Sequence, residues 1–194
     1  DYEGPLCICI IDDGSTDNSW EVMGTHFVDT ATSDESDHLE IYYESNIGRF
    51  NKTTYVTIRQ DNAGPSGARN TGISHTISDT DYYAILDADD EMYENKVSKC
   101  IDIAITNKNS IGAVYADYDT YHTSTDKKIR EFKEPYSRRR LIEECIVHSG
   151  SVINKLALEA VQEETGFYDE TMRTCEDYDL WMRISEKYIL CHIP

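Results

Sequence analysis

The chain has 194 residues, of which 37 are acidic and 18 basic, so its formal net charge is −19 at neutral pH. A field of that sign repels nucleic acid and anionic lipid, which argues against a polyanion-binding role. Apolar residues make up 39% of the chain, enough for one globular core, and no apolar run approaches the ~20 residues of a membrane span.

The cysteines favour a reducing compartment. They show no C-x-x-C spacing and lie mostly in apolar runs, which suits small buried hydrophobic residues better than a zinc site. The six are Cys7, Cys9, Cys100, Cys145, Cys175 and Cys191. We therefore expect free thiols and a cytoplasmic location, with attachment to the cytoplasmic face of a membrane left open.

The first predicted elements are a strand and a helix. An apolar run at 6–11 ends abruptly at Asp12-Asp13, a pattern typical of a buried parallel strand whose carboxyl end opens into a polar loop. Apolar residues then recur at helical spacing from Trp20 to Phe27. Residues 29–53 carry no clear period, so we expect a long excursion with one short strand at 39–43.

Strand and helix patterns continue to alternate after this excursion. We expect strands at 55–58, 82–86, 113–118, 129–132, 151–153 and 188–192, and helices at 64–77, 97–105, 141–145, 156–163 and 178–187. Such alternation predicts an α/β fold with a mostly parallel sheet, in which ligands bind beyond the carboxyl ends of the strands. Acidic clusters at 12–13 and 87–90 lie at such ends.

Asp87 and Asp89 follow the strand expected at 82–86 and frame a D-x-D sequence. Mg²⁺ and Mn²⁺ prefer oxygen ligands, and Mg²⁺ is usually held by one or two carboxylates plus substrate phosphates. A cation between carboxylates and phosphates would also offset the repulsion between this acidic chain and an anionic ligand. The common alternative is a solvated acidic cap on the next helix. A calcium loop is excluded because its Gly and Glu positions hold Met92 and Ser98.

Four segments together resemble family 2 glycosyltransferases in their order and spacing. They are Asp12-Asp13-Gly14-Ser15-Thr16-Asp17, Asn62 through Gly72, Asp87-Ala88-Asp89-Asp90, and Glu176-Asp177-Tyr178-Asp179-Leu180-Trp181. The resemblance covers about residues 6–192 and implies a GT-A fold and transfer with inversion. It implies a single domain over residues 1–194, with a nucleotide-binding half at about 1–110 and an acceptor-side half at about 111–194. Because family members begin with one strand more, we expect the first strand of the fold to be absent from this chain.

The resemblance assigns nucleotide contacts to the first three motifs. It places Asp13 against the base, where a carboxylate can accept a hydrogen bond from a ring N–H, with Asp12 beside it. Gly14 lets the backbone turn tightly next to the ligand. Arg69 offers donors to base or phosphate, and Asp87 reaches toward the ribose as well as the metal. The alternatives are a capped strand-to-helix turn for the Asp pair and a structural ion pair for Arg69.

The fourth motif is where we expect the chemistry. Transfer with inversion needs a base for the acceptor hydroxyl, and the resemblance implies Asp177 in that role with Glu176 orienting the acceptor. Trp181 could stack on an acceptor sugar, although packing is the favoured role. His148 could line the acceptor side, although a lone histidine is more often structural.

These expectations describe a metal-dependent, inverting glycosyltransferase. With Mn²⁺ or Mg²⁺ held by Asp89 and Asp87, it would move a sugar from a nucleoside-diphosphate sugar, a UDP-sugar first of all, to a hydroxyl of a glycan, lipid or protein acceptor. One alternative is a catalytically silent nucleotide-sugar or carbohydrate-binding module, because fold does not dictate function. Another is a sugar-nucleotide pyrophosphorylase, whose usual Gly-rich loop with a following basic residue is not visible in this sequence.

Overall fold

The chain forms two compact units. The computed structural model describes residues 2–27, 32–36, 39–45, 53–164 and 166–194. The N-terminal unit comprises residues 2–80 and 168–174, and the C-terminal unit comprises residues 81–167 and 175–194. The division falls at residue 80, ahead of the boundary near 110 that the sequence suggested between two halves.

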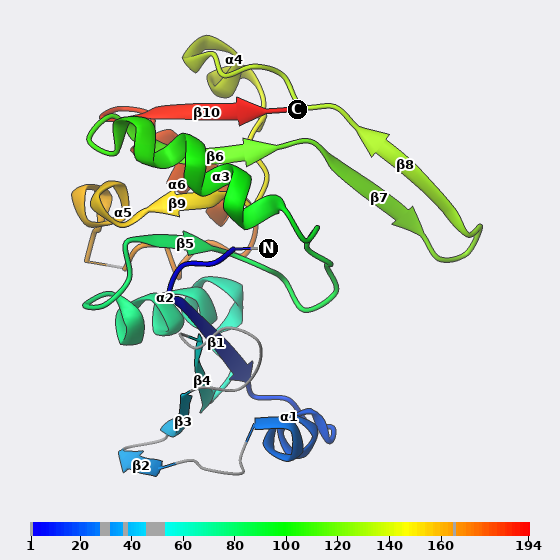
Figure 1. Cartoon of the computed structure of the whole chain (residues 1–194), viewed down its shortest axis with the longest axis vertical. Coiled ribbons are helices and arrows are strands. Elements are labelled where there is room, and N and C mark those ends of the chain that lie inside the picture. The colour runs from blue at the N-terminus through cyan, green and yellow to red at the C-terminus, as the bar shows by residue number, and fades with distance from the viewer. Residues whose placement is uncertain (1, 28–31, 37–38, 46–52, 165) are drawn as a thin grey trace. The chain divides into compact units, whose positions relative to one another are not determined.

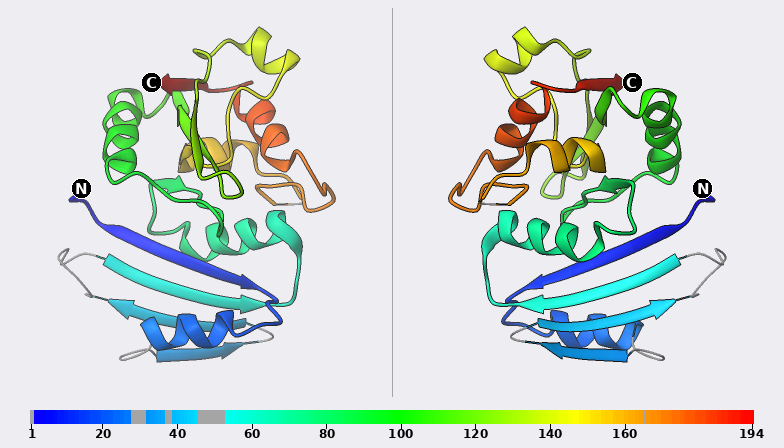
Figure 2. Two further views of the ribbon diagram at one scale, coloured as in Figure 1. Left: turned by 90° about the vertical axis from the view of Figure 1, so that its right-hand side faces the viewer. Right: turned by 90° about the vertical axis from the view of Figure 1, so that its left-hand side faces the viewer.

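The N-terminal unit contains a four-stranded sheet with the order β1-β4-β3-β2 and two helices (Figures 1 and 2). Its elements are β1 (Leu6–Asp13), α1 (Ser19–Phe27), β2 (Thr32–Ser36), β3 (Leu39–Ser45), β4 (Thr53–Gln60) and α2 (Gly64–Thr76). Strands β1 and β4 are parallel, whereas β3 runs antiparallel to both β4 and β2. The acidic end of β1 therefore lies beside the end of β4.

The segment expected to be an excursion with one short strand contains two strands. Strand β3 confirms and extends the strand expected at 39–43, and β2 was not expected. Strand β2 reads Thr-Ser-Asp-Glu-Ser, and a strand without apolar residues offers no hydrophobic alternation to detect. Its pairing with β3 depends on the folded chain and cannot be predicted from the local sequence.

The two helices of this unit lie on opposite faces of its sheet (Figure 1). A Cβ placed on Gly72 of α2 would lie 3.5 Å from the side chain of Ile11 and 3.7 Å from Sγ of Cys9, so the α2 backbone packs directly on β1. On the other face, the guanidinium of Arg59 in β4 lies over the ring of Trp20 in α1, 5.6 Å from its centroid. Because side chains alternate between the two faces of a strand, the pair of β1 and β4 can contact α2 on one face and α1 on the other.

The C-terminal unit is built on a second four-stranded sheet with the order β10-β6-β9-β5. Its elements are β5 (Tyr82–Ala84), α3 (Lys96–Ala104), a 3₁₀ turn (Ile105–Asn107), β6 (Ile111–Ala116), β7 (Tyr118–His122), β8 (Lys127–Glu131), α4 (Arg138–Glu143), β9 (Val152–Asn154), α5 (Lys155–Val161), α6 (Glu176–Ile184) and β10 (Ile189–Ile193). Among the described residues, none of the helices has the length and apolar character needed to cross a bilayer.

Both sheets are mixed, which corrects the expectation of a mostly parallel sheet. In the second sheet β10 and β6 are parallel, but β9 lies antiparallel between β6 and β5. An apolar run indicates a buried strand, yet it does not report the direction in which the strand enters the sheet. Direction depends on the connections, and β9 arrives through α4 and an irregular loop instead of a crossover helix packed on the sheet.

The core of the C-terminal unit lies between its sheet and the helices on either face. Figures 1 and 2 show α3 on one face and α5 with α6 on the other. From α6, Leu180, Trp181 and Ile184 are fully buried. A Cβ on Gly112 of β6 would lie 2.6 Å from the side chains of Ile184 and Tyr188, so only glycine allows this close packing.

The cysteines are free, as the sequence suggested. All six occur as thiols in the structure. Burial, with a smaller effect from Cys7, raises the pKa of Cys9 to about 12. Burial also raises the pKa of Cys191. Protonated thiols in such positions behave as small hydrophobic residues and not as nucleophiles.

A two-stranded ribbon of β7 and β8 leaves the second sheet after β6 (Figure 1). Its base is closed by Asp117, whose side chain is only 4% exposed. Oδ1 of Asp117 accepts the backbone N–H of Lys133 at 2.9 Å and contacts Nε2 of His192 in β10 at 2.8 Å. Arg130 lies 3.6 Å from Oδ2. These contacts satisfy a buried carboxylate and tie both ends of the ribbon to the sheet.

We expect Asp117→Asn to make the stability of the protein less sensitive to acid. Burial by itself raises the pKa of Asp117, but the hydrogen bond from Lys133 and the contacts with His192 and Arg130 outweigh it, so the pKa lies below its usual value. A depressed pKa gives stability that is present above the unfolded pKa of about 3.9 and is lost as pH falls through the folded value. Thermal unfolding toward acid pH should show a steeper loss in the wild type than in the variant.

The matched control for this experiment is Asp102→Asn, which removes an exposed carboxylate from α3. Its acid slope should equal that of the wild type. If Asp117→Asn kept the wild-type slope as well, the carboxylate of Asp117 would not couple protonation to folding.

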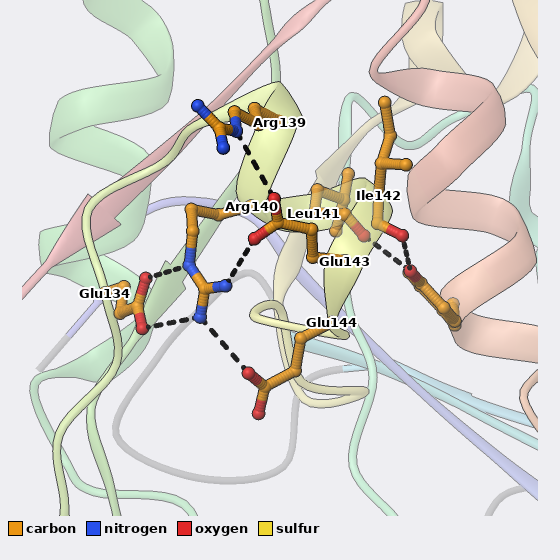
Figure 3. Close-up of polar contacts among 8 residues, drawn as sticks. Glu134, Arg139, Arg140, Leu141, Ile142, Glu143 and Glu144 are labelled. Atoms are coloured by element: carbon orange, nitrogen blue, oxygen red, sulfur yellow. Dashed lines mark hydrogen bonds and ion pairs between the residues drawn. The ribbon is translucent and has the colours of Figure 1, made fainter.

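The basic residues at the start of α4 are used in ion pairs within the C-terminal unit. Arg140 reaches Glu134 through two nitrogens, at 2.9 and 3.0 Å, as Figure 3 shows. The same guanidinium contacts Glu143 at 2.7 Å and Glu144 at 3.2 Å. The pairs are too exposed to stabilise the fold strongly. They do neutralise the guanidinium, so it does not act as an isolated cation for a polyanion.

Candidate functional site

Asp12 ends β1 in a buried position. Its side chain has no exposed surface, Oδ1 accepts the backbone N–H of Ser15 at 2.9 Å, and Oδ2 lies 3.5 Å from Nε of Arg59. These contacts shape the turn that follows β1. The assignment of Asp12 to a nucleotide contact stays a prediction, and in the structure its carboxylate orders this turn.

Asp13 joins the end of β1 to the start of α2. Its Oδ1 accepts hydrogen bonds from Nε2 of Gln60 at 2.7 Å and from the backbone N–H of Ala63 at 2.9 Å, and Oδ2 accepts the N–H of Gly64 at 2.8 Å. These bonds satisfy N–H groups at the helix start that have no partner within the helix. Within the described part of the chain, Oδ2 keeps one acceptor position, which a base N–H could use.

Gly14 makes the tight turn that the motif predicts. Its φ is +76°, and a Cβ there would lie 2.9 Å from the backbone nitrogen of Asn62. Nδ2 of Asn62 in turn donates to the carbonyl of Asp13 at 2.8 Å. The close approach seen in the structure is therefore between the first and second motifs, both within the N-terminal unit.

We expect Gly14→Ala to destabilise the protein more than Gly64→Ala. Both glycines have a φ of +76°, which costs an L-residue about 1–2 kcal/mol. A Cβ on Gly64 meets nothing within 4 Å, whereas one on Gly14 is forced against backbone, which adds about 1–3 kcal/mol. The free energies of unfolding in urea measure the difference. Equal losses would show that the turn can open to admit the methyl group.

The second motif also holds a distant segment of its own unit. Asn70 of α2 donates to the carbonyl of Tyr168 at 2.8 Å and accepts its N–H at 2.8 Å. The guanidinium of Arg69 lies 5.3 Å from the centroid of the Tyr168 ring. Sequence reasoning missed both roles, because nothing local signals that 168–174 returns to the N-terminal unit. Arg69 stays a predicted ligand residue, and it also packs on Tyr168.

The D-x-D sequence occupies a tight turn beyond β5. The backbone N–H of Asp90 donates to the carbonyl of Asp87 at 3.0 Å, so Asp87 and Asp89 lie in one turn. Asp87 is partly buried and its Oδ2 lies 3.4 Å from the hydroxyl of Ser149, whereas Asp89 is exposed. The turn follows the short strand β5, which pairs with β9 in the antiparallel direction.

This turn suits a hard divalent cation whose coordination substrate phosphates complete. Among the residues the structure describes, no group of three or more His, Cys, Asp or Glu side chains could hold a metal ion by itself. Mg²⁺ is commonly bound by only one or two carboxylates together with phosphates. Asp87 and Asp89 offer that oxygen donor set, so the residues fit Mg²⁺ or Mn²⁺, and binding stays a prediction.

Glu176 and Asp177 form the first turn of α6. Oδ1 of Asp177 accepts the N–H of Tyr178 at 2.8 Å. Acidic residues are favourable at a helix N-terminus, so the helix by itself can account for them. Cys175 immediately before them has a φ of +63°, a conformation that residues other than glycine rarely adopt and that clusters at functional sites. No pattern in the sequence predicts this backbone conformation of Cys175.

The two acceptor candidates differ in exposure. Trp181 is fully buried, so its ring packs in the core and presents no face to a sugar. His148 is partly buried beside Tyr118, with ring centroids 5.4 Å apart. Burial, then the charges of Lys96 and Lys133, lower its pKa to about 4, so it is neutral at pH 7. Its Nε2 is buried without a hydrogen-bond partner among the described residues.

Comparison with known proteins defines the class. Residues 2–164 match Glycosyl transferase family 2. The chain therefore belongs to this family and is a glycosyltransferase domain with the GT-A fold. The matched range includes the motifs at 12–17, 62–72 and 87–90 but ends before Glu176, so the assignment of the base depends on the residues themselves.

Three relatives illustrate what the chain is similar to. An uncharacterized glycosyltransferase of Rickettsia bellii is 27% identical over 187 residues, which are 91% of this chain and 23% of that protein. Chondroitin synthase of Escherichia coli is 25% identical over 189 residues, 97% of this chain and 23% of that protein. The succinoglycan biosynthesis protein ExoW of Rhizobium meliloti is 54% identical over 35 residues, 18% of this chain and 11% of that protein. The chain spans about a quarter of the length of the first two.

Proposed function

We propose that the chain is the donor-binding and catalytic part of a metal-dependent, inverting glycosyltransferase. It moves a sugar from a nucleoside-diphosphate sugar, most simply a UDP-sugar, to an acceptor hydroxyl. The observation that carries the proposal is that one compact unit contains both the acidic turn Asp87–Asp89 and the acidic helix start Glu176–Asp177. Sugar transfer needs a cation at the leaving diphosphate and a base at the acceptor, and these two groups can supply them.

Charge supports the metal requirement. A chain with a net charge of −19 repels a nucleoside diphosphate unless a cation lies between carboxylate and phosphate. Asp89 is exposed and is the residue we propose as the main metal ligand, with Asp87 as the second ligand and the contact to the ribose. Mn²⁺ or Mg²⁺ would supply Lewis-acid stabilisation of the leaving diphosphate.

Asp177 is the base in this proposal. Its carboxylate takes the proton of the acceptor hydroxyl while that oxygen forms a bond to the anomeric carbon, on the face opposite the diphosphate. The bond from the anomeric carbon to the diphosphate oxygen breaks in the same displacement, which inverts the configuration. Glu176 orients the acceptor, and no covalent intermediate with the protein is needed.

The nucleoside contacts belong to the N-terminal unit. Asp13 keeps one acceptor position on Oδ2 within the described residues, and Gly14 leaves the adjacent turn without a side chain. Arg69, whose guanidinium lies over the ring of Tyr168, can donate to the base or a phosphate.

A glycan is the acceptor class that the relatives favour. The names of two of them refer to chondroitin and succinoglycan, both polysaccharides. Lipid and protein acceptors are the alternatives. His148 is the candidate for an acceptor contact because it is only partly buried and lies in the C-terminal unit, which also contains Asp177.

The test is a calorimetric titration with UDP, GDP and dTDP, each with and without Mn²⁺. We expect one nucleotide, UDP first of all, to bind with an affinity that Mn²⁺ increases. Binding without transfer to any glycan would support the catalytically silent module instead. Release of pyrophosphate from a sugar phosphate and a nucleoside triphosphate would indicate the pyrophosphorylase alternative. Absence of metal-dependent binding for all three nucleotides would contradict the proposal.

A further inference from the structure

A loop in the C-terminal unit contacts the acidic turn of the proposed mechanism. We call residues 145–151, between α4 and β9, the 145–151 loop. Near its end, the hydroxyl of Ser149 lies 3.4 Å from Oδ2 of Asp87. At its start, Cys145 follows α4, and the carbonyl of Leu141 in α4 accepts the hydroxyl of Tyr178, the residue after Asp177. The loop therefore contacts the proposed metal ligand, and the helix before it contacts the helix that contains the proposed base.

The helix that leads into the loop, α4, is attached to α6. The hydroxyl of Tyr178, the residue after Asp177, donates to the carbonyl of Leu141 at 2.5 Å. Figure 3 shows this carbonyl in α4, beside the Arg140 ion pairs. Sγ of Cys145 then donates to the carbonyl of Val147 at 3.1 Å. Tyr178 thus connects α6 to α4, and the Cys145 thiol orders the first residues of the loop.

The end of the loop is held by Lys96, the first residue of α3. Nζ of Lys96 donates to the carbonyl of Gly150, and the hydroxyl of Ser151 donates to the carbonyl of His148 at 2.6 Å. A Cβ on Gly150 would lie 3.2 Å from the ring of His148 and 3.2 Å from Nζ of Lys96, so the packing is close. Lys96 is itself partly buried. Its ammonium therefore has a defined partner on the loop.

We propose that Lys96 is a positioning residue that acts on Asp87 through the 145–151 loop. By holding Gly150, it keeps the hydroxyl of the neighbouring Ser149 at the carboxylate of Asp87. At 3.4 Å that contact is too long to add much stability, but it restricts how the carboxylate can rotate. Partners that orient a metal ligand in this way control the affinity for the metal. The inference depends on the proposed role of Asp87.

The test is Lys96→Met, which keeps an unbranched apolar stem and removes the ammonium. In the presence of UDP, the Kd for Mn²⁺ measured by calorimetry should rise by about 10- to 100-fold, the usual effect of losing a partner of a metal ligand. Turnover at saturating Mn²⁺ should fall much less, and the affinity for UDP without metal should stay unchanged. Lys99→Met, which removes an exposed ammonium from the same helix, is the matched control and should behave as the wild type.

Ser149→Ala separates this route from a direct role of Lys96. The single variant should weaken Mn²⁺ binding in the same direction, and the double variant Lys96→Met with Ser149→Ala should be no weaker than Lys96→Met alone, because both changes interrupt one chain of contacts. Additive losses would overturn the proposal. So would a loss of metal-free UDP affinity in Lys96→Met, which would indicate that the ammonium binds the phosphate itself.

The outcomes distinguish this inference from the proposed function. If the wild type shows no Mn²⁺-dependent UDP binding, the proposed function fails and the role of Lys96 fails with it. If the wild type binds Mn²⁺ with UDP and Lys96→Met retains the wild-type Kd in a folded state, only the positioning role is wrong. Circular dichroism and the thermal midpoint show whether each variant is folded. If Lys96→Met does not fold, Ser149→Ala, which removes only a hydroxyl, still tests the contact with Asp87.

Discussion

Asp177→Asn should reduce turnover by about 10²- to 10⁴-fold, the usual contribution of general base catalysis. The amide keeps the size of the side chain and can still accept the backbone N–H of Tyr178, a bond of 2.8 Å in the wild type. It cannot take a proton from the acceptor hydroxyl. Donor binding should therefore persist, because the proposed donor ligands are Asp13, Arg69 and the Asp87–Asp89 turn. Initial rates of transfer and the Kd for UDP with Mn²⁺ measure the two effects separately.

Glu186→Gln is the control for this variant. Glu186 lies just beyond the end of α6, and its exposed carboxylate lies 3.6 Å from Arg138, so its loss removes the same charge without touching the helix start. It should leave turnover unchanged. Transfer by Asp177→Asn at more than about a tenth of the wild-type rate is too fast for a missing general base and would move the base assignment to another carboxylate.

Asp89→Ala should abolish the dependence of nucleotide binding on Mn²⁺. The residue is exposed, so the substitution creates no cavity and the fold should persist. With only Asp87 left in the turn, the cation loses one of two proposed protein ligands, and the Kd for UDP with Mn²⁺ should rise to the value found without metal. The paired titrations described for the wild type provide the measurement.

Glu91→Ala removes an exposed charge from the loop that follows the same turn and serves as the matched control. Because it is not a proposed ligand, UDP should bind to it as tightly in Mn²⁺ as to the wild type. An Asp89→Ala protein with full Mn²⁺-dependent affinity would show that the metal is held elsewhere, and the D-x-D turn would then be only an acidic cap before α3.

Much of the fold could be predicted because its elements have local signatures. The apolar run of β1, the glycine-proline start of α2 and the amphipathic α3 all lie where their patterns predicted. The D-x-D turn and the acidic helix start were likewise recognised as motifs. Each depends on neighbours within a few residues, which is the range over which periodicity and capping carry information.

The roles of individual site residues were harder to predict because they depend on burial and on distant partners. Asp12 and Asp13 are adjacent acids, yet the first is buried against Arg59 and the second caps α2. Trp181 could be assigned to the core only once its exposure was known. No single-sequence pattern distinguishes these cases, because side-chain burial is decided by elements that arrive from elsewhere in the chain.

The sequence by itself determined the class of the protein, the location of most of its strands and helices, and the four motifs with their proposed chemistry. Only the tertiary structure decided the direction of β9, the presence of β2, the return of 168–174 to the N-terminal unit and the contact of the 145–151 loop with Lys96 and Asp87. The physical reason is the distance along the chain over which each effect acts. Propensity and periodicity act between residues close in sequence, whereas strand order and loop contacts depend on closing long segments of chain against surfaces that form only in the folded protein.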